Sequence, residues 1–441
     1  MRQRRAEAWE RFAVADLPTE AEEVWRYSGI DTFDLDRFSP RQPVAAGGLS
    51  TAISQARLLA GRVGERCALV VTVNGQVAEI EIGTGVPAGS LDVEQASVKQ
   101  DPDHRLGELA TPRDAFGHLH DAFMTESVLL GIRSKARLDA PVVLVHLVGG
   151  SSDAEGLRVA AFPHTVIDLG ESAGASVVEV LGSLEPSLDG DGGPALVVPV
   201  TELLVGDGGE LSYANVQVLG SGCVQVGTQA SRVGSAASLR SFSVGLGAGY
   251  ARLRTDSDLV GEGGSTLLLA GYLGTGQQVH DFRTLQDHRA PRTRSELLFK
   301  GALSDASRSV YSGLIRIRNQ AHGADAFQTN NNLVLSEGAR AYSVPNLDIQ
   351  ENDVRCSHAS TVGPVDEDQL YYLESRGIRP DAAERLVVAG FFAELAQRSP
   401  VPGVGLWMEQ EVASVLGLPA PARSLPAPTR AGADGNGEGN G

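Results

Sequence analysis

One cysteine and one histidine stand two residues apart near the end of the chain, at Cys356 and His358. In an extended strand such residues share a face and lie about 6.5 Å apart, so a thiolate and an imidazole could bind one metal ion or cluster. Val354 has the same parity, so the alternative is a small buried cysteine and a hydrogen-bonded core histidine. The spacing alone favours this packing role. Iron-sulfur clusters usually take four protein ligands, so the pair would need ligands from a second chain.

A second candidate group is His280-Asp281 followed by Asp287-His288. An imidazole beside a carboxylate can orient a ligand or act as a general base. The spacing matches no metal signature, however, and we favour a polar turn between structural units.

Two glycine-rich stretches, 206–209 and 261–264, lack a following Lys and Ser or Thr, so the sequence predicts no triphosphate site. No Gly-x-Ser-x-Gly elbow of a hydrolase occurs. We therefore expect no catalytic residue, no bound nucleotide and a protein that is not a stand-alone enzyme.

The elements that must position these residues fall into four regions. Region 1–140 is predicted to be mainly helical α/β, region 141–363 a β-rich core, region 364–418 helical, and the Pro/Ala/Gly-rich tail 419–441 disordered. In the first region we expect a helix with Trp9 and Phe12, a helix opened by Thr19-x-x-Glu22, a helix over 50–62, two strands over 67–82 turned at Asn74-Gly75, and a helix over 114–130.

The β-rich core contains short β-prone runs separated by Gly, Asp, Asn or Pro, with no helix-length pattern for about 200 residues. A sandwich, a propeller or a solenoid would fit. The run Gln328 to Asn332 resembles the Asn-rich turns that stack in β-helices, and we therefore favour a parallel β-helix. Beyond it, we expect a helix over 366–376 stopped at Gly377 and another with Asp381 as its N-cap.

Composition limits the class of protein further. The 441 residues include 52 glycines but only 5% aromatics, which suits an elongated, repetitive structure with many turns. A net charge of -18 with three lysines argues against nucleic acid and anionic membranes as partners. Three cysteines (Cys67, Cys223, Cys356) and the lack of an apolar leader or anchor predict a cytoplasmic protein.

Seven stretches in the second half of the chain form a distinctive set. They are 288–291 (His-Arg-Ala-Pro), 298–301 (Leu-Phe-Lys-Gly), 309–313 (Ser-Val-Tyr-Ser-Gly), 328–333 (Gln-Thr-Asn-Asn-Asn-Leu), 345–349 (Pro-Asn-Leu-Asp-Ile), 353–358 (Asp-Val-Arg-Cys-Ser-His) and 370–378 (Leu-Tyr-Tyr-Leu-Glu-Ser-Arg-Gly-Ile). Together they resemble the SufB/SufD family of iron-sulfur assembly scaffolds. The Cys-Ser-His form and the Trp-Arg-Tyr segment at 25–27 resemble SufD in particular.

This resemblance implies a β-helix flanked by helical regions, paired through the β-helix with a SufB-like subunit, with a homodimer as an option when the chain is alone. It also implies a SufC-like ATPase docked on the carboxy-terminal helices, where we expect Leu370, Leu373, Phe391 and Phe392 to make the contact. A transient iron-sulfur cluster would form at the interface with SufB, with His358, and less securely Cys356, as this chain's contribution.

The alternative is a β-helix polysaccharide lyase or hydrolase, which needs converging carboxylates or an arginine base. Asp256 and Asp258 are the available acids, but nothing in the sequence converges on them.

Overall fold

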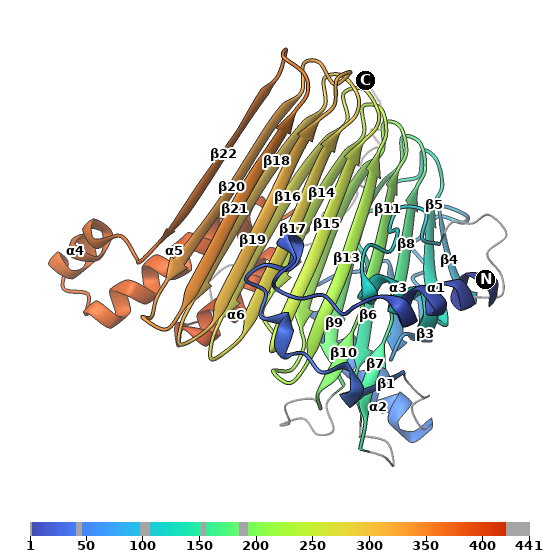
Figure 1. The fold of residues 1–441 in the computed structure, drawn as a ribbon, viewed down its shortest axis with the longest axis horizontal. Coiled ribbons are helices and arrows are strands. Elements are labelled where there is room, and N and C mark those ends of the chain that lie inside the picture. Colours follow the sequence, from blue (N-terminus) through green and yellow to red (C-terminus); the bar gives the residue numbers. More distant parts are fainter. Residues whose placement is uncertain (1, 41–45, 98–105, 151–155, 185–192, 420–441) are drawn as a thin grey trace, which may run out of the picture.

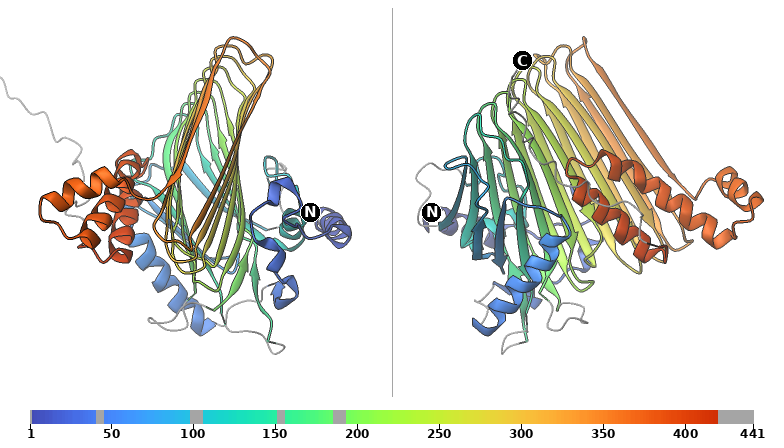
Figure 2. Two further views of the ribbon diagram at one scale, coloured as in Figure 1. Left: turned by 60° about the vertical axis from the view of Figure 1, so that its left-hand side comes forward. Right: turned by 180° about the vertical axis from the view of Figure 1, so that it is seen from behind.

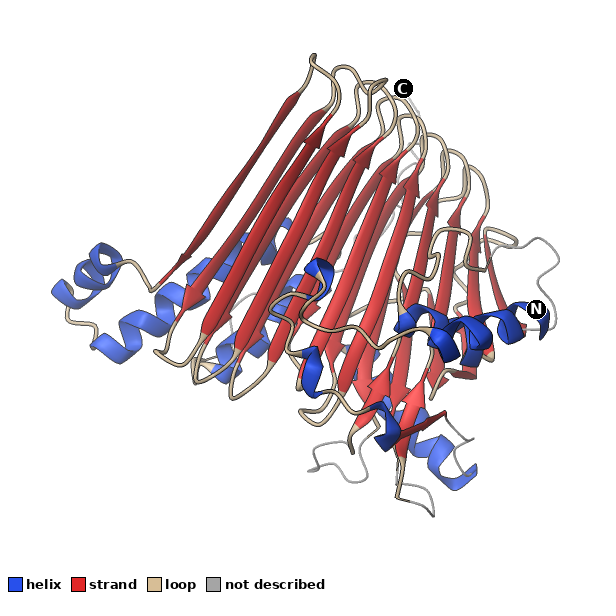
Figure 3. Ribbon diagram, viewed as in Figure 1, coloured by secondary structure: helices blue, strands red, loops and turns tan. Residues whose placement is uncertain are grey.

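Parallel strands stacked in register build the body of the molecule, a β-solenoid of about 6 turns (Figures 1 and 3). The structure is a computed structural model that describes residues 2–40, 46–97, 106–150, 156–184 and 193–419. The predicted parallel β-helix is confirmed.

Two sheets line the solenoid. In the described residues the 12-stranded sheet contains β4 (Leu91–Ser97), β5 (Glu126–Ile132), β8 (His164–Leu169), β11 (Val200–Val205), β13 (Val224–Val233), β15 (Tyr250–Leu259), β17 (Val279–His288), β19 (Arg308–Ile317) and β21 (Arg340–Ile349), joined by β1 (Phe38–Pro40), β7 (Arg158–Ala161) and β10 (Ala195–Val197). The 10-stranded sheet contains β3 (Gln76–Ile82), β2 (Ala68–Val73), β6 (Val142–Val148), β9 (Gly174–Ser183), β12 (Glu210–Val218), β14 (Ser238–Gly245), β16 (Ser265–Gly274), β18 (Arg294–Leu303), β20 (Asp325–Val334) and β22 (Arg355–Gly363).

Burial on both faces explains the composition of the first strands. All residues of β2 (ALVVTV) and β6 (VVLVHLV) are buried, and β-branched residues suit such strands. Because parallel neighbours pair in register, equivalent side chains stack in columns along the solenoid. A residue's column therefore decides whether it faces the interior or the outside.

The two ends of the solenoid differ. At the first end β3 and β4 pair antiparallel with β2 and β5 and close the sheets. At the last end β21 pairs with β19 and β22 with β20, and no further described strand follows either one. An open edge of this kind presents unpaired backbone groups.

Helices cover the outer faces of the sheets (Figure 2). The 12-stranded sheet carries α1 (Arg2–Val14) and α3 (Ala115–Phe123), with short 3-10 turns at η1 (Glu23–Trp25), η2 (Ile30–Thr32) and η3 (Leu35–Arg37). The 10-stranded sheet carries α2 (Ala46–Gly61), α5 (Pro380–Arg398) and α6 (Pro402–Val415), and α4 (Glu367–Ser375) projects beside α5. No helix in the described ranges is both long and apolar enough to cross a bilayer.

Several predicted elements are confirmed: the first helix, the helix over 50–62, the hairpin at Asn74-Gly75 and the helix capped by Asp366, whose carboxylate accepts from the Gln369 N–H. The helix expected to begin after Asp381 is α5, which begins at Pro380 with Arg379 rather than Asp381 at the N-cap. The disordered tail predicted for 419–441 lies, from residue 420 on, outside the described residues.

Four other local predictions were wrong. The Thr19 N–H does donate to Glu22 at 3.2 Å, but the helix there is a single 3-10 turn. The helix over 114–130 ends at Phe123, because the Val- and Leu-rich residues after it form β5. The parallel ladder includes β2 and β5 and so begins before residue 141. The run 328–332 lies inside β20 rather than in a turn.

Candidate functional site at the open end of the solenoid

Cys356 and His358 lie on β22, the last strand of the 10-stranded sheet. Register places Cys356 over Ala326 and His358 over Gln328, and these two neighbours are 2% and 0% exposed. Cys356 and His358 therefore belong to inward-facing columns of the solenoid, as their shared parity predicted. No described coil covers this last rung, so His358 is exposed and Cys356 is half-buried. The core histidine expected from spacing alone is thus wrong, because the column ends at this residue.

One thiol and one imidazole are too few donors to hold an iron-sulfur cluster by themselves. Burial raises the pKa of the Cys356 thiol, which keeps it protonated at neutral pH in the isolated chain. No group of three His, Cys, Asp or Glu side chains that could hold a metal ion occurs in the part of the chain described. Further ligands must come from outside the described residues before a cluster can be held here.

A network of side-chain hydrogen bonds lies around β20, the strand next to β22, which bears the pair. The Tyr272 hydroxyl donates to Asn332 Oδ1 at 2.7 Å, Asn332 donates to Asn330 Oδ1 at 2.8 Å, and Ser309 donates to Asn332 at 3.2 Å. Asn330 and Asn332 are 1% and 2% exposed. These bonds satisfy the buried amides of Asn330 and Asn332, so these two asparagines can lie within a strand rather than in a turn.

The group His280, Asp281, Asp287 and His288 forms part of β17, and every one of these side chains is fully buried. The predicted polar turn is therefore wrong. The two histidines face inward and the two aspartates outward, so the four do not converge. Their partners are structural: Arg252 and Arg283 for Asp281, Arg289 and Arg318 for Asp287, and the hydroxyls of Thr293 and Ser295 for His288.

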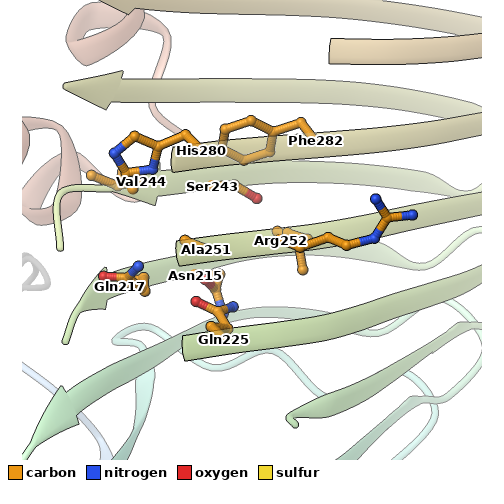
Figure 4. Close-up of a pocket in the computed structure, with 11 residues that line it drawn as sticks. Asn215, Gln217, Gln225, Ser243, Val244, Ala251, Arg252, His280 and Phe282 are labelled. Carbon is orange, nitrogen blue, oxygen red and sulfur yellow. The ribbon is translucent and has the colours of Figure 1, made fainter. Parts of the chain in front are cut away.

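A small cavity lies inside the solenoid beside His280 (Figure 4). It arises because Ala251 is small where its column carries Gln225 and His280 in the neighbouring rungs, and Gly245 is small where its column carries Gln217 and Tyr272. Among the described residues, neither ring nitrogen of His280 makes a well-formed hydrogen bond, and Gln225 Oε1 has no hydrogen-bond partner. Burial lowers the pKa of His280 to about 4, so the ring is neutral at pH 7. The cavity is large enough to hold about one water molecule.

Two buried histidine networks were missed by sequence reasoning. His120 Nε2 and His164 Nδ1 are 2.9 Å apart, and His164 Nε2 lies 2.8 Å from Glu202 Oε1. In β6, His146 Nε2 lies 3.0 Å from Glu179 Oε1. Each side chain is at most 5% exposed, so these groups join elements of the fold rather than meet a ligand. These histidines and acids are far apart in the sequence and stand singly in apolar segments, on α3 and on several strands, so no spacing signal could have paired them.

The four residues expected to dock an ATPase differ in exposure. Leu370, Leu373 and Phe391 are half-buried, whereas Phe392 is 1% exposed and packs into the core under α5. Phe392 therefore offers no surface to a partner. Lys300 lies over the Phe391 ring, 4.7 Å from its centroid.

Tyr371 and Tyr372, at 74% and 56% exposed, are the large side chains that α4 presents to solvent. Their position beside Leu370 and Leu373 makes α4 the more accessible apolar surface of this helical region.

The carboxylates considered for glycan cleavage bind arginines instead. Asp256 pairs with Arg254 and Arg113 at 3.0 Å each, and Asp258 pairs with Arg289 at 2.8 Å. They lie on the outer face of β15 with no second acid free to act with them in the described part of the chain, so the geometry gives the lyase or hydrolase alternative no support.

Comparison with known proteins gives a consistent result. Residues 150–391 match the family model described as SUF system FeS cluster assembly, SufBD core domain. The chain is 34% identical over 310 residues to an iron-sulfur cluster assembly SufBD family protein of Mycobacterium tuberculosis, covering 68% of this chain and 74% of that protein. It is 27% identical over 411 residues to the iron-sulfur cluster assembly protein SufD of Escherichia coli, covering 92% and 90%. For SufD of Bacillus subtilis the identity is 32% over 295 residues, covering 65% and 63%.

Proposed function

Because this chain belongs to the SufBD family of iron-sulfur cluster assembly proteins, we propose that it is a SufD-like scaffold subunit of a SUF complex. In this proposal it pairs with a SufB-like subunit through the open end of the solenoid, docks a SufC-like ATPase on its carboxy-terminal helices, and has no turnover of its own. The cluster is cargo that forms transiently at the SufB interface. The cytoplasmic location stays a prediction.

The open last rung is the observation that carries the proposal. It brings together two inward-facing donors, Cys356 and His358, and an uncovered sheet edge. Apolar side chains are exposed on the same two strands: Val344 and Leu347 at 38% each, Ile349 at 44% and Val362 at 46%. A partner that stacks on this rung would cover the apolar side chains and bring further cluster ligands to the histidine in the same step.

The ligand role is tested by His358→Ala in the chain co-produced with a SufB-like and a SufC-like protein. Since His358 is exposed and makes no hydrogen bond within the described residues, its loss should change the free energy of unfolding by less than about 0.5 kcal/mol. We expect the complex to assemble but to yield less iron and acid-labile sulfide, with a smaller effect for Cys356→Ala.

The matched control is His322→Ala, an exposed histidine in the turn between β19 and β20. It should leave iron and sulfide unchanged. Normal cluster content in the His358→Ala complex would remove the ligand role.

The pairing surface is tested by Leu347→Lys and Val362→Lys. Both side chains are already partly in solvent, so the isolated variants should stay folded, while co-purification with the SufB-like subunit should be lost. The same changes should abolish any homodimer of the chain alone, measured by sedimentation. Unchanged co-purification would place the interface elsewhere.

The ATPase surface is tested by Tyr372→Asp on α4. A charge at Phe392 would be buried and would unfold the helix, so that position cannot report on binding. We expect Tyr372→Asp to weaken capture of the SufC-like ATPase without lowering the melting temperature, and full capture would contradict this docking surface.

A further inference from the structure

Residues 24–28, which we call the strap, cross the outer face of the 12-stranded sheet (Figure 1). Three successive strands hold the strap by its backbone. Arg252 on β15 donates to the Val24 carbonyl at 2.8 Å, Arg283 on β17 to the Arg26 carbonyl at 2.9 Å, and Arg308 on β19 to the Tyr27 carbonyl at 3.5 Å. The strap is therefore tied to the rungs one after another.

Buried charge and an aromatic ring fix the middle of the strap. Trp25 is 1% exposed, and the Arg252 guanidinium lies 3.6 Å from the centre of its ring. Asp281, fully buried, bonds Arg252 at 2.5 Å and Arg283 at 2.6 Å. Moving the strap would separate the Trp25 ring and the strap's backbone carbonyls from these arginines. The position of the strap is therefore well determined.

The strap reaches the terminal rung through one aromatic stack. Tyr27 lies on Tyr342 of β21 with ring centres 4.5 Å apart and planes 3° apart. Tyr27 has a φ of 67°, which is uncommon for a residue with a side chain, and this backbone places the ring on Tyr342.

A hydrogen bond between the two edge strands connects the Tyr27–Tyr342 stack to the strand that bears the candidate site. Ser343, next to Tyr342 in the chain, accepts a hydrogen bond of 2.7 Å from Ser360 of β22. In the described part of the chain this is the side-chain hydrogen bond that joins the two edge strands. Ser360 lies two residues after His358 on the same inward side.

We propose that Tyr27 and Tyr342 are positioning residues for Cys356 and His358. Their stack holds β21 in place, and the Ser343–Ser360 hydrogen bond ties β22 to β21. The two edge strands, and with them Cys356 and His358, therefore have one geometry before a partner binds. The purpose of this arrangement rests on the proposed function, but the restraint itself belongs to the isolated chain and can be measured there.

The test uses the Cys356 thiol as a reporter of local opening. In the native, isolated chain, iodoacetamide labelling at one pH is followed for each cysteine by peptide mass spectrometry. We expect Tyr342→Ala and Tyr27→Ala to label Cys356 about fivefold faster, the ratio that corresponds to losing one aromatic stack. Cys67, which precedes β2 at the first end of the solenoid, and Cys223, which precedes β13 in its middle, should label at the wild-type rate.

Tyr342→Phe is the matched control, because it keeps the stack and removes only a hydroxyl with no hydrogen bond in the described residues. It should restore the wild-type rate. An unchanged Cys356 rate in both alanine variants, a phenylalanine variant that behaves like alanine, or faster labelling of all three cysteines would each overturn the proposal.

The assembled complex then tests whether this positioning matters for cluster assembly. A Tyr342→Ala complex should bind both partners and recover less iron and sulfide than wild type, and a normal recovery would overturn the positioning role. Failure of the ligand hypothesis gives a different result. In that case His358→Ala would leave the iron and sulfide content of the complex unchanged, while Tyr342→Ala would still label Cys356 faster in the isolated chain.

Discussion

Replacing His280 with glutamine should make the stability of the chain less sensitive to acid. Burial holds the pKa of His280 at about 4, against an ordinary value of 6.5. Above pH 6.5 the ring is neutral in the folded and unfolded chain, so its contribution is constant. Between pH 6.5 and 4 only the unfolded chain binds the proton, and the free energy of unfolding falls by about 1.4 kcal/mol per pH unit. This one residue therefore removes about 2 kcal/mol by pH 5 and about 3 kcal/mol by pH 4.

Urea unfolding of the full chain at pH 7 and pH 5 measures the effect. The difference between the two pH values should be about 2 kcal/mol smaller in His280→Gln than in wild type. Gln225→Ala changes the same cavity without a titratable group and should shift both measurements equally. If His280→Gln keeps the full wild-type pH dependence, the ring is not held neutral by burial and the reasoning fails. His120 and His288, with pKa values lowered by burial to about 3 and about 4, act in the same direction and account for part of the remaining acid sensitivity.

Further predictions concern the carboxy-terminal helices, measured by thermal and urea unfolding. A methyl group on Gly403 of α6 would overlap the Val63 carbonyl oxygen, so Gly403→Ala should destabilise the fold by about 1 to 3 kcal/mol. Gly390 of α5 has open space around it, and Gly390→Ala should stabilise by up to about 1 kcal/mol; the opposite ranking would contradict the packing described for α6. Phe392→Ala should cost about 3 to 5 kcal/mol, whereas Tyr371→Ala, at an exposed site, should stay within about 0.5 kcal/mol, and equal losses would refute the assignment of inner and outer faces.

The sequence predicted the solenoid because short β-prone runs with Gly and Asn breaks continue without a helical pattern. It also predicted the shared face of Cys356 and His358, since parity in a strand needs no knowledge of the neighbours. It could not predict that His358 is exposed, because exposure depends on whether another coil stacks on β22. That fact belongs to the end of the fold and not to the local sequence.

The misjudged polar groups share a physical cause. Polar residues such as those at 280–288 and 328–332 are typical of turns only when water must satisfy them. In this solenoid other rungs supply partners for several of these residues, as Arg318 does for Asp287 at 2.9 Å and Tyr272 for Asn332 at 2.7 Å. Those partners come from other rungs, so a local pattern could not reveal them.

The contact between α6 and the residues that follow α2, Arg62 and Val63, determines when the newly made chain can finish folding. Rung neighbours lie only about 30 residues apart, so the solenoid can grow coil by coil as it leaves the ribosome. Arg62 forms an ion pair with Glu411 of α6, and its guanidinium carbon lies 4.8 Å from the centroid of the Trp407 ring. Since these partners are translated about 350 residues later, this contact forms late. A chain that ended before α6 would leave the apolar surface beside Val63 uncovered for chaperones and proteases to recognise.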